Sequence, residues 1–110
     1  MKMLIFPLKK EWYEKIKSGE KTVEYREVKP YWDRRIQKEV QKFGSLLFLR
    51  EHGDWIEFNN IPLECKLREG YGSNYMSANI ARIEIINGLD TDLEIDKPVY
   101  AIHLAAVKEA

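Results

Sequence analysis

The chain has 110 residues, 45% hydrophobic and 33% charged, a composition typical of one globular domain. Its 18 basic and 18 acidic residues give a formal net charge of zero, which argues against a strong non-specific nucleic-acid binder but allows a local basic cleft. No apolar run approaches the ~20 residues that span a bilayer, and the lone Cys65 has no disulfide partner, so we expect one cytoplasmic domain, residues 1–110, without a membrane partner.

The N-terminal part predicts a strand followed by a helix. Met3–Phe6 is a short apolar run that Pro7 ends, and it is interpreted as the first strand. Apolar residues then recur every four positions, at Leu8, Trp12 and Ile16. With charged residues between them, this spacing is typical of an amphipathic helix. Gly19 stands where a glycine would end that helix.

A second strand and a second helix are predicted next. Residues 21–26 alternate and are rich in β-branched and aromatic types, which favours a strand. Pro30 suits the first turn of a helix from Tyr31 to Gln41. A helix there aligns Arg34, Lys38 and Lys42, either as a path for an RNA backbone or as a solvated face. Within this segment, Trp32 is the best tryptophan candidate for an exposed stacking platform.

The second half of the chain predicts strands. The expected segments are Leu46–Arg50 and Trp55–Phe58 as a hairpin, an alternating strand after Pro62, a long strand ending at Ile86 with Ala81, Ile83 and Ile85 facing inward, and Val99–Val107. Many short strands with two helices predict an α+β fold. We expect a small β-barrel of about five to seven strands, partly open, with the helices at its rim.

The segment from Gly19 to Arg26 carries the most chemical information. It places Lys21, Glu24 and Arg26 within six residues, directly after the predicted end of a helix. Glu24 and Arg26 are two positions apart on a strand and therefore project from the same face. They form either a salt bridge on the outer face or part of a polar pocket that a ligand completes.

The pattern Gly19-x-Lys21-x-x-Glu24-x-Arg26 resembles the signature of the ASCH family. The later Arg68-x-Gly70-Tyr71 resembles a motif of its smaller bacterial and phage-like members. The resemblance implies a PUA-like barrel that binds RNA or a modified nucleoside. It also implies a polar cleft, without metal or cofactor, formed by Lys21, Glu24, Arg26, Arg68 and Tyr71.

Two alternatives remain open. One branch of the ASCH family removes the acetyl group from N4-acetylcytidine with a lysine, a threonine and a glutamate, and others have been linked to ribonuclease activity. Lys21 matches that lysine, whereas Glu24 occupies the threonine position. If the chain is such a metal-independent hydrolase, the resemblance implies Lys21 and Glu24 as its catalytic residues. The other alternative is a protein-interaction domain without a small ligand.

Overall fold

The computed structural model describes residues 4–41, 56–57 and 63–109. In chain order the elements are β1 (Leu4–Leu8), α1 (Lys10–Lys17), β2 (Val23–Glu27), α2 (Pro30–Gln41), β3 (Ile56–Glu57), β4 (Leu63–Glu69), β5 (Tyr75–Asn87), the 3₁₀ turn η1 (Gly88–Asp90) and β6 (Pro98–Glu109). Both predicted helices are confirmed. The prediction that Pro7 ends the first strand is wrong, because β1 continues through Pro7 to Leu8 and α1 begins at Lys10. The predicted strand Leu46–Arg50 lies outside the described residues, as do Trp55 and Phe58 of the predicted strand Trp55–Phe58.

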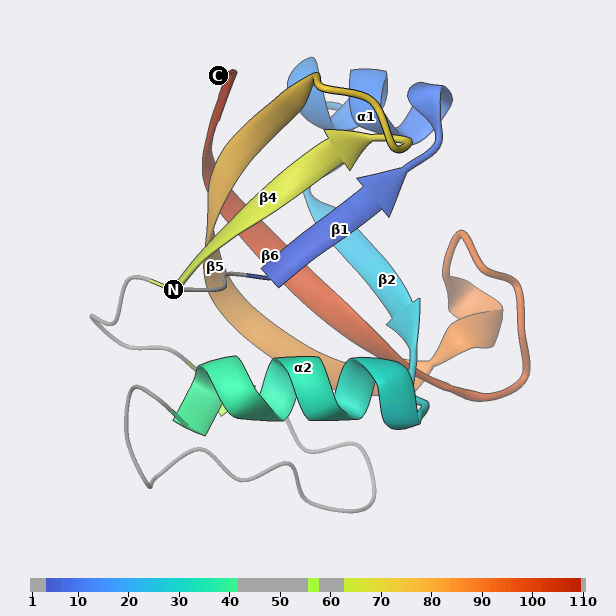
Figure 1. Ribbon diagram of the computed structural model, residues 1–110. Helices are drawn as coiled ribbons and strands as arrows, with labels where there is room; N and C mark the ends of the chain where they lie inside the picture. The colour runs from blue at the N-terminus through green and yellow to red at the C-terminus, as the bar shows by residue number, and fades with distance from the viewer. Residues whose placement is uncertain (1–3, 42–55, 58–62, 110) are drawn as a thin grey trace.

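The strands form one mixed sheet in the order β1-β4-β5-β6-β2, with β3 paired to β5. The pairing of β1 with β4 is parallel, and the other pairings are antiparallel. The sheet is strongly curled, and α1 lies over one end of it while α2 crosses the other (Figure 1). Of the two helices described, neither is long and apolar enough to span a membrane.

The sheet is a half-barrel, so the barrel of about five to seven strands expected from the sequence is formed only in part. The edge strands β1 and β2 are not hydrogen-bonded to each other as neighbours in the sheet. Pro7 lies in β1, where its missing N–H removes one donor from the strand, and proline within sheets is confined largely to edge strands. The α+β class and the two helices are confirmed, while the barrel stays open between β1 and β2.

The core fills the concave side of the half-barrel. Its members come from β1, α1, α2, β4, β5 and β6, and they include Phe6, Ile16, Ile36, Leu67, Met76, Ile80 and Ile102. A polar contact anchors α2 against this core, because the buried Tyr100 of β6 donates a hydrogen bond to the carboxylate of Asp33. Burial and this hydrogen bond raise the pKa of Tyr100.

A β-bulge changes which residues of β5 face inward. Ile80 pairs with Leu104, but Arg82 pairs with His103, so Ala81 is an extra residue in β5. The prediction that Ala81 faces inward is therefore wrong, and Ala81 is exposed, whereas Ile80 and Ile83 are buried. Strict alternation fails here because the extra residue shifts the pattern by one position.

Candidate functional site

The turn after α1 determines where Lys21 lies. Gly19 has φ of 85°, a left-handed conformation that favours glycine, and its N–H donates to the carbonyl of Ile16. The N–H of Lys21 donates back to the carbonyl of Lys15. These contacts fold the chain back over α1, so that Lys21 faces the helix just before β2 begins.

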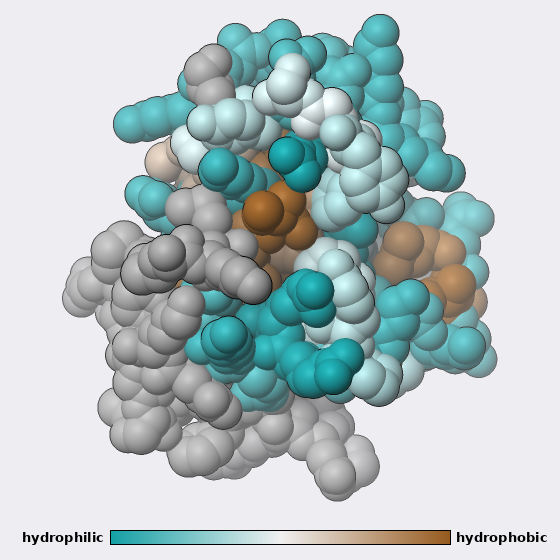
Figure 2. Space-filling model, viewed as in Figure 1, coloured by the Kyte–Doolittle hydropathy of each residue, from teal (hydrophilic) through white to brown (hydrophobic). Residues whose placement is uncertain are grey.

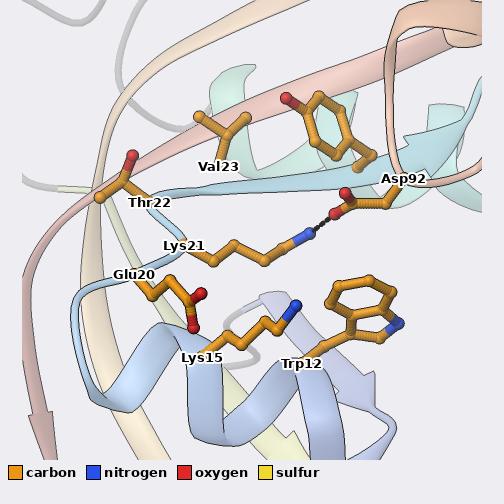
Figure 3. Close-up of a pocket in the computed structure, with 8 residues that line it drawn as sticks. Trp12, Lys15, Glu20, Lys21, Thr22, Val23 and Asp92 are labelled. Atoms are coloured by element: carbon orange, nitrogen blue, oxygen red, sulfur yellow. Dashed lines mark hydrogen bonds and ion pairs between the residues drawn. The ribbon is translucent and has the colours of Figure 1, made fainter.

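Lys21 is held by an ion pair and two aromatic rings. Its ammonium contacts the carboxylate of Asp92, and it lies 4.8 Å from the ring centre of Trp12 and 5.1 Å from that of Tyr25 (Figure 3). The ion pair and the two rings hold the Lys21 side chain between α1 and the loop that carries Asp92.

An open cleft of about 340 Å³ surrounds this ion pair. The cleft lies between α1 and the start of β2, and it is lined by Trp12, Lys15, Glu20, Lys21, Thr22, Val23, Tyr25 and Asp92. Figure 3 shows Trp12 and Lys15 rising from α1 and Asp92 approaching from the loop that follows η1. Neither Glu24 nor Arg26 lines this cleft.

Glu24 points into the interior of the half-barrel. It is 6% exposed, and its Oε1 accepts a hydrogen bond of 2.9 Å from the N–H of Tyr25. Its Oε2 has no hydrogen-bond partner among the described residues. Burial raises the pKa of Glu24, although the positive charges of Arg26 and Lys21 oppose that rise. Glu24 is therefore neither an outer-face ion-pair residue nor a wall of the Lys21 cleft.

Arg26 bridges the opening of the half-barrel. Its Nη2 donates a hydrogen bond of 2.7 Å to the carbonyl oxygen of Pro7 in β1. The guanidinium carbon lies 5.4 Å from the ring centre of Phe6 and 5.0 Å from that of Trp32. Arg26 makes no ion pair with Glu24, although the two residues share a face of β2. The contacts of Arg26 are those of a residue that joins two strands.

Trp32 does not provide the exposed stacking platform suggested by the sequence. It is 7% exposed and stacks on Phe6 with ring centres 5.2 Å apart. Its neighbour Tyr31 is exposed instead, because one step along a helix turns a side chain by about a quarter of the circumference.

Arg68 and Tyr71 lie in a second hollow, which we call the basic groove. The groove has a volume of about 840 Å³ and lies between α2, β1, β4 and the β4–β5 hairpin. Its described lining residues are Leu4, Ile5, Pro7, Tyr31, Arg34, Arg35, Lys38, Glu39, Lys66, Arg68 and Tyr71. Figure 2 shows a hydrophobic patch within a hollow, with hydrophilic surface on either side.

The parallel pairing of β1 with β4 builds the floor and one rim of the groove. Ile5 lies beside Lys66, and Pro7 lies beside Arg68, so two apolar residues run next to two cations. Gly70, with φ of 57°, lies at the end of β4, where its N–H donates to the carbonyl of Leu8. The hairpin that follows carries Tyr71 at its tip.

The opposite rim comes from α2. Arg34 and Lys38 are four residues apart and line the groove together with Tyr31 and Arg35. Lys42, the third member of the predicted basic stripe, lies outside the described residues. The sequence reasoning missed Tyr31, Arg35 and Lys66 as members of the groove. Tyr31 and Arg35 lie on the surface of α2 beside Arg34 and Lys38, and their helical spacing could have identified them from the sequence.

The five residues expected in one cleft thus occupy four places. Arg68 and Tyr71 share the basic groove, and Lys21 lies in the cleft beside α1. Glu24 is in the interior, and Arg26 spans the opening of the half-barrel.

Within the described residues, no group of three His, Cys, Asp or Glu side chains is arranged to hold a metal ion.

Cys65 and His103 line neither of these two hollows. Cys65 is buried, and burial raises the pKa of its thiol to about 12, which keeps it protonated and unreactive. The Nε2 atom of His103 lies 2.7 Å from Oε2 of Glu84 and 3.4 Å from the guanidinium of Arg82. His103 is thus a half-buried member of a polar cluster between β5 and β6.

Comparisons of the chain with family models, curated proteins and solved structures found no match.

Proposed function

We propose that this chain is an RNA-binding domain of the PUA-like ASCH type and that RNA lies in the basic groove. The observation that carries the proposal is the composition of the groove. Its described lining has five cations and one carboxylate, Glu39, and it includes two exposed tyrosines, whereas the whole chain has a net charge of zero. A neutral protein with five cations and one carboxylate around one hollow has there the local positive charge that a phosphate backbone requires.

The cations stand on both rims of the groove, which favours an elongated anion. Arg34 and Lys38 lie on α2, while Lys66 and Arg68 lie on β4. A strand running between these rims can place phosphates near both. If three to five phosphates are contacted, the logarithm of the binding constant falls with the logarithm of salt concentration with a slope of about −2 to −3.5.

The cleft around Lys21 supports a second candidate ligand, a modified nucleoside. Its volume of about 340 Å³ is at the lower end of the ~300–1,000 Å³ range of small-molecule pockets. Glu20 and Asp92 supply acceptors for an exocyclic amine, and Thr22 supplies a hydroxyl group. Turnover of N4-acetylcytidine by wild type, and its loss in Lys21→Ala, would extend this candidate to the hydrolase alternative.

The test of RNA binding uses two variants of equal net charge. In Arg34→Glu/Lys38→Glu, two groove cations become acidic, and in Lys10→Glu/Lys108→Glu, two exposed cations that do not line the groove become acidic. Each variant lowers the net charge by four. With a labelled single-stranded 12-mer RNA in ~0.1 M salt, we expect the groove variant to weaken binding by about tenfold or more and the control by less than threefold. Equal losses would contradict a groove-specific site.

A further inference from the structure

We infer, on the basis of the proposed RNA binding, that the basic groove takes single-stranded RNA with unpaired bases, and that one base stacks on Tyr71. The charges alone do not choose between a single strand and a duplex, because both present phosphates. The choice comes from the uncharged part of the groove, namely the floor and the two tyrosines.

Tyr71 offers its ring to a ligand with little competition from the protein. It is 91% exposed at the tip of the β4–β5 hairpin, so both faces of its ring are open. Its backbone neighbour Gly70 holds the hairpin end in place through the hydrogen bond to Leu8. An aromatic ring presented in this way at the edge of a basic groove matches the arrangement on which single-stranded nucleic acids stack.

The floor of the groove is apolar. Ile5 is 42% exposed and stands there with Pro7 and part of Leu4, between the cationic rims. Unpaired bases bring apolar faces into contact with such a floor while their phosphates reach the cations. In a duplex the faces of the bases are already stacked on one another, so the floor and Tyr71 would gain little from binding it. The combination therefore favours a single strand.

Tyr31 provides an internal comparison for Tyr71. The guanidinium carbon of Arg35 lies 3.6 Å from the centre of the Tyr31 ring and covers one of its faces. Tyr31 also makes an edge-to-face contact with Trp32, with an interplanar angle of 82°. Tyr31 is 48% exposed, about half the value for Tyr71. We therefore assign the main stacking role to Tyr71 and a wall of the groove to Tyr31.

The experiment measures the affinity of the full chain for two labelled probes, a single-stranded 12-mer RNA and a 12-base-pair RNA duplex, at the same salt concentration. We expect the single strand to bind at least fivefold more tightly than the duplex. Tyr71→Leu should weaken single-strand binding by about five- to 160-fold, the range that loss of one stacked base implies. Tyr71→Trp should retain it, and Tyr31→Leu should weaken it less than Tyr71→Leu does.

The outcomes separate this inference from the proposed function. If the duplex binds as tightly as the single strand, or if Tyr71→Leu leaves single-strand binding unchanged, the single-strand inference is wrong. RNA binding in the groove would still hold in that case, provided that Arg34→Glu/Lys38→Glu weakens it. If neither probe responds to that double variant, the proposed function itself fails. Circular dichroism of Tyr71→Leu checks that the fold is intact, as the exposure of this side chain leads us to expect.

Discussion

The guanidinium of Arg26 donates a hydrogen bond of 2.7 Å to the carbonyl oxygen of Pro7, and this contact joins the two edge strands of the half-barrel. Arg26 comes from the segment that resembles a ligand-binding signature, yet its contacts are with the protein. Pro7 also lines the basic groove. The hydrogen bond from Arg26 therefore helps to hold the floor of the groove in place.

Replacing Arg26 should destabilise the fold. Arg26→Ala removes the hydrogen bond to Pro7 and the packing against Phe6 and Trp32, so we expect the free energy of unfolding to fall by about 2–4 kcal/mol. Urea denaturation measures this change. The control Arg82→Ala removes a more exposed guanidinium and should cost less than about 1 kcal/mol. A similar, small cost for both variants would contradict the bridging role.

The buried carboxyl group of Glu24 should make stability depend on pH. Because burial raises its pKa in the folded state, the stability that Glu24 contributes is present below its unfolded pKa and is lost as the pH rises through its folded pKa. Glu24→Gln does not ionise, so its melting temperature relative to wild type should increase between pH 4 and pH 7. A difference that stays constant over this range would show that Glu24 does not titrate as inferred.

Glu84 provides a control of opposite sign. The hydrogen bond with His103 and the charge of Arg82 lower its pKa against the opposing effect of burial, so its contribution is present above the unfolded pKa and lost as the pH falls. The melting temperature of Glu84→Gln relative to wild type should therefore be lower at pH 7 than at pH 4. Thermal melts of both variants in the same buffers would reveal the two opposite trends.

The contact between Lys21 and Asp92 should be energetically coupled and independent of RNA binding. In a double-mutant cycle with Lys21→Met and Asp92→Asn, we expect a coupling energy of about 1 kcal/mol, because the lysine side chain is only 10% exposed. The more exposed pair Lys17 and Glu109 should give a value near zero. If Lys21→Met weakens binding of the 12-mer RNA as much as the groove variant does, RNA extends into the Lys21 cleft.

Cys65 should be inert in the folded protein. Its thiol is buried, and its pKa of about 12 leaves almost no thiolate at neutral pH. Iodoacetamide at pH 8 should therefore modify the native chain very slowly and the urea-unfolded chain rapidly, as mass spectrometry would show. Rapid modification of the native chain would mean that the interior around β4 opens readily.

Local patterns predicted much of the fold because helices and strands have different periods. The spacing of Trp12 and Ile16 predicted α1, and Pro30 marked the start of α2. The direction in which Glu24 points could not be predicted in this way, since alternation says which residues share a face but not which face is inside. The exposure of Ala81 was equally hidden, because nothing in the local sequence marks the bulge.

The candidate site depended on pairing between distant segments. Arg68 and Tyr71 were identified from the sequence, and the stripe containing Arg34 and Lys38 was identified separately. Only the parallel pairing of β1 with β4, together with the position of α2, brings them around one groove. Lys21 and Arg68 belong to two motifs that the family resemblance implies in one cleft. Only the pairing of distant segments shows that they line two different hollows.

The most direct test of RNA binding in the basic groove is a titration of isotope-labelled protein with a single-stranded 12-mer RNA, followed by NMR. We predict shifts of the backbone amides of Arg34, Lys38, Lys66, Arg68 and Tyr71, with the amides around Lys21 and Asp92 largely unchanged. Shifts confined to the Lys21 cleft, or unchanged spectra at millimolar RNA and low salt, would contradict this account.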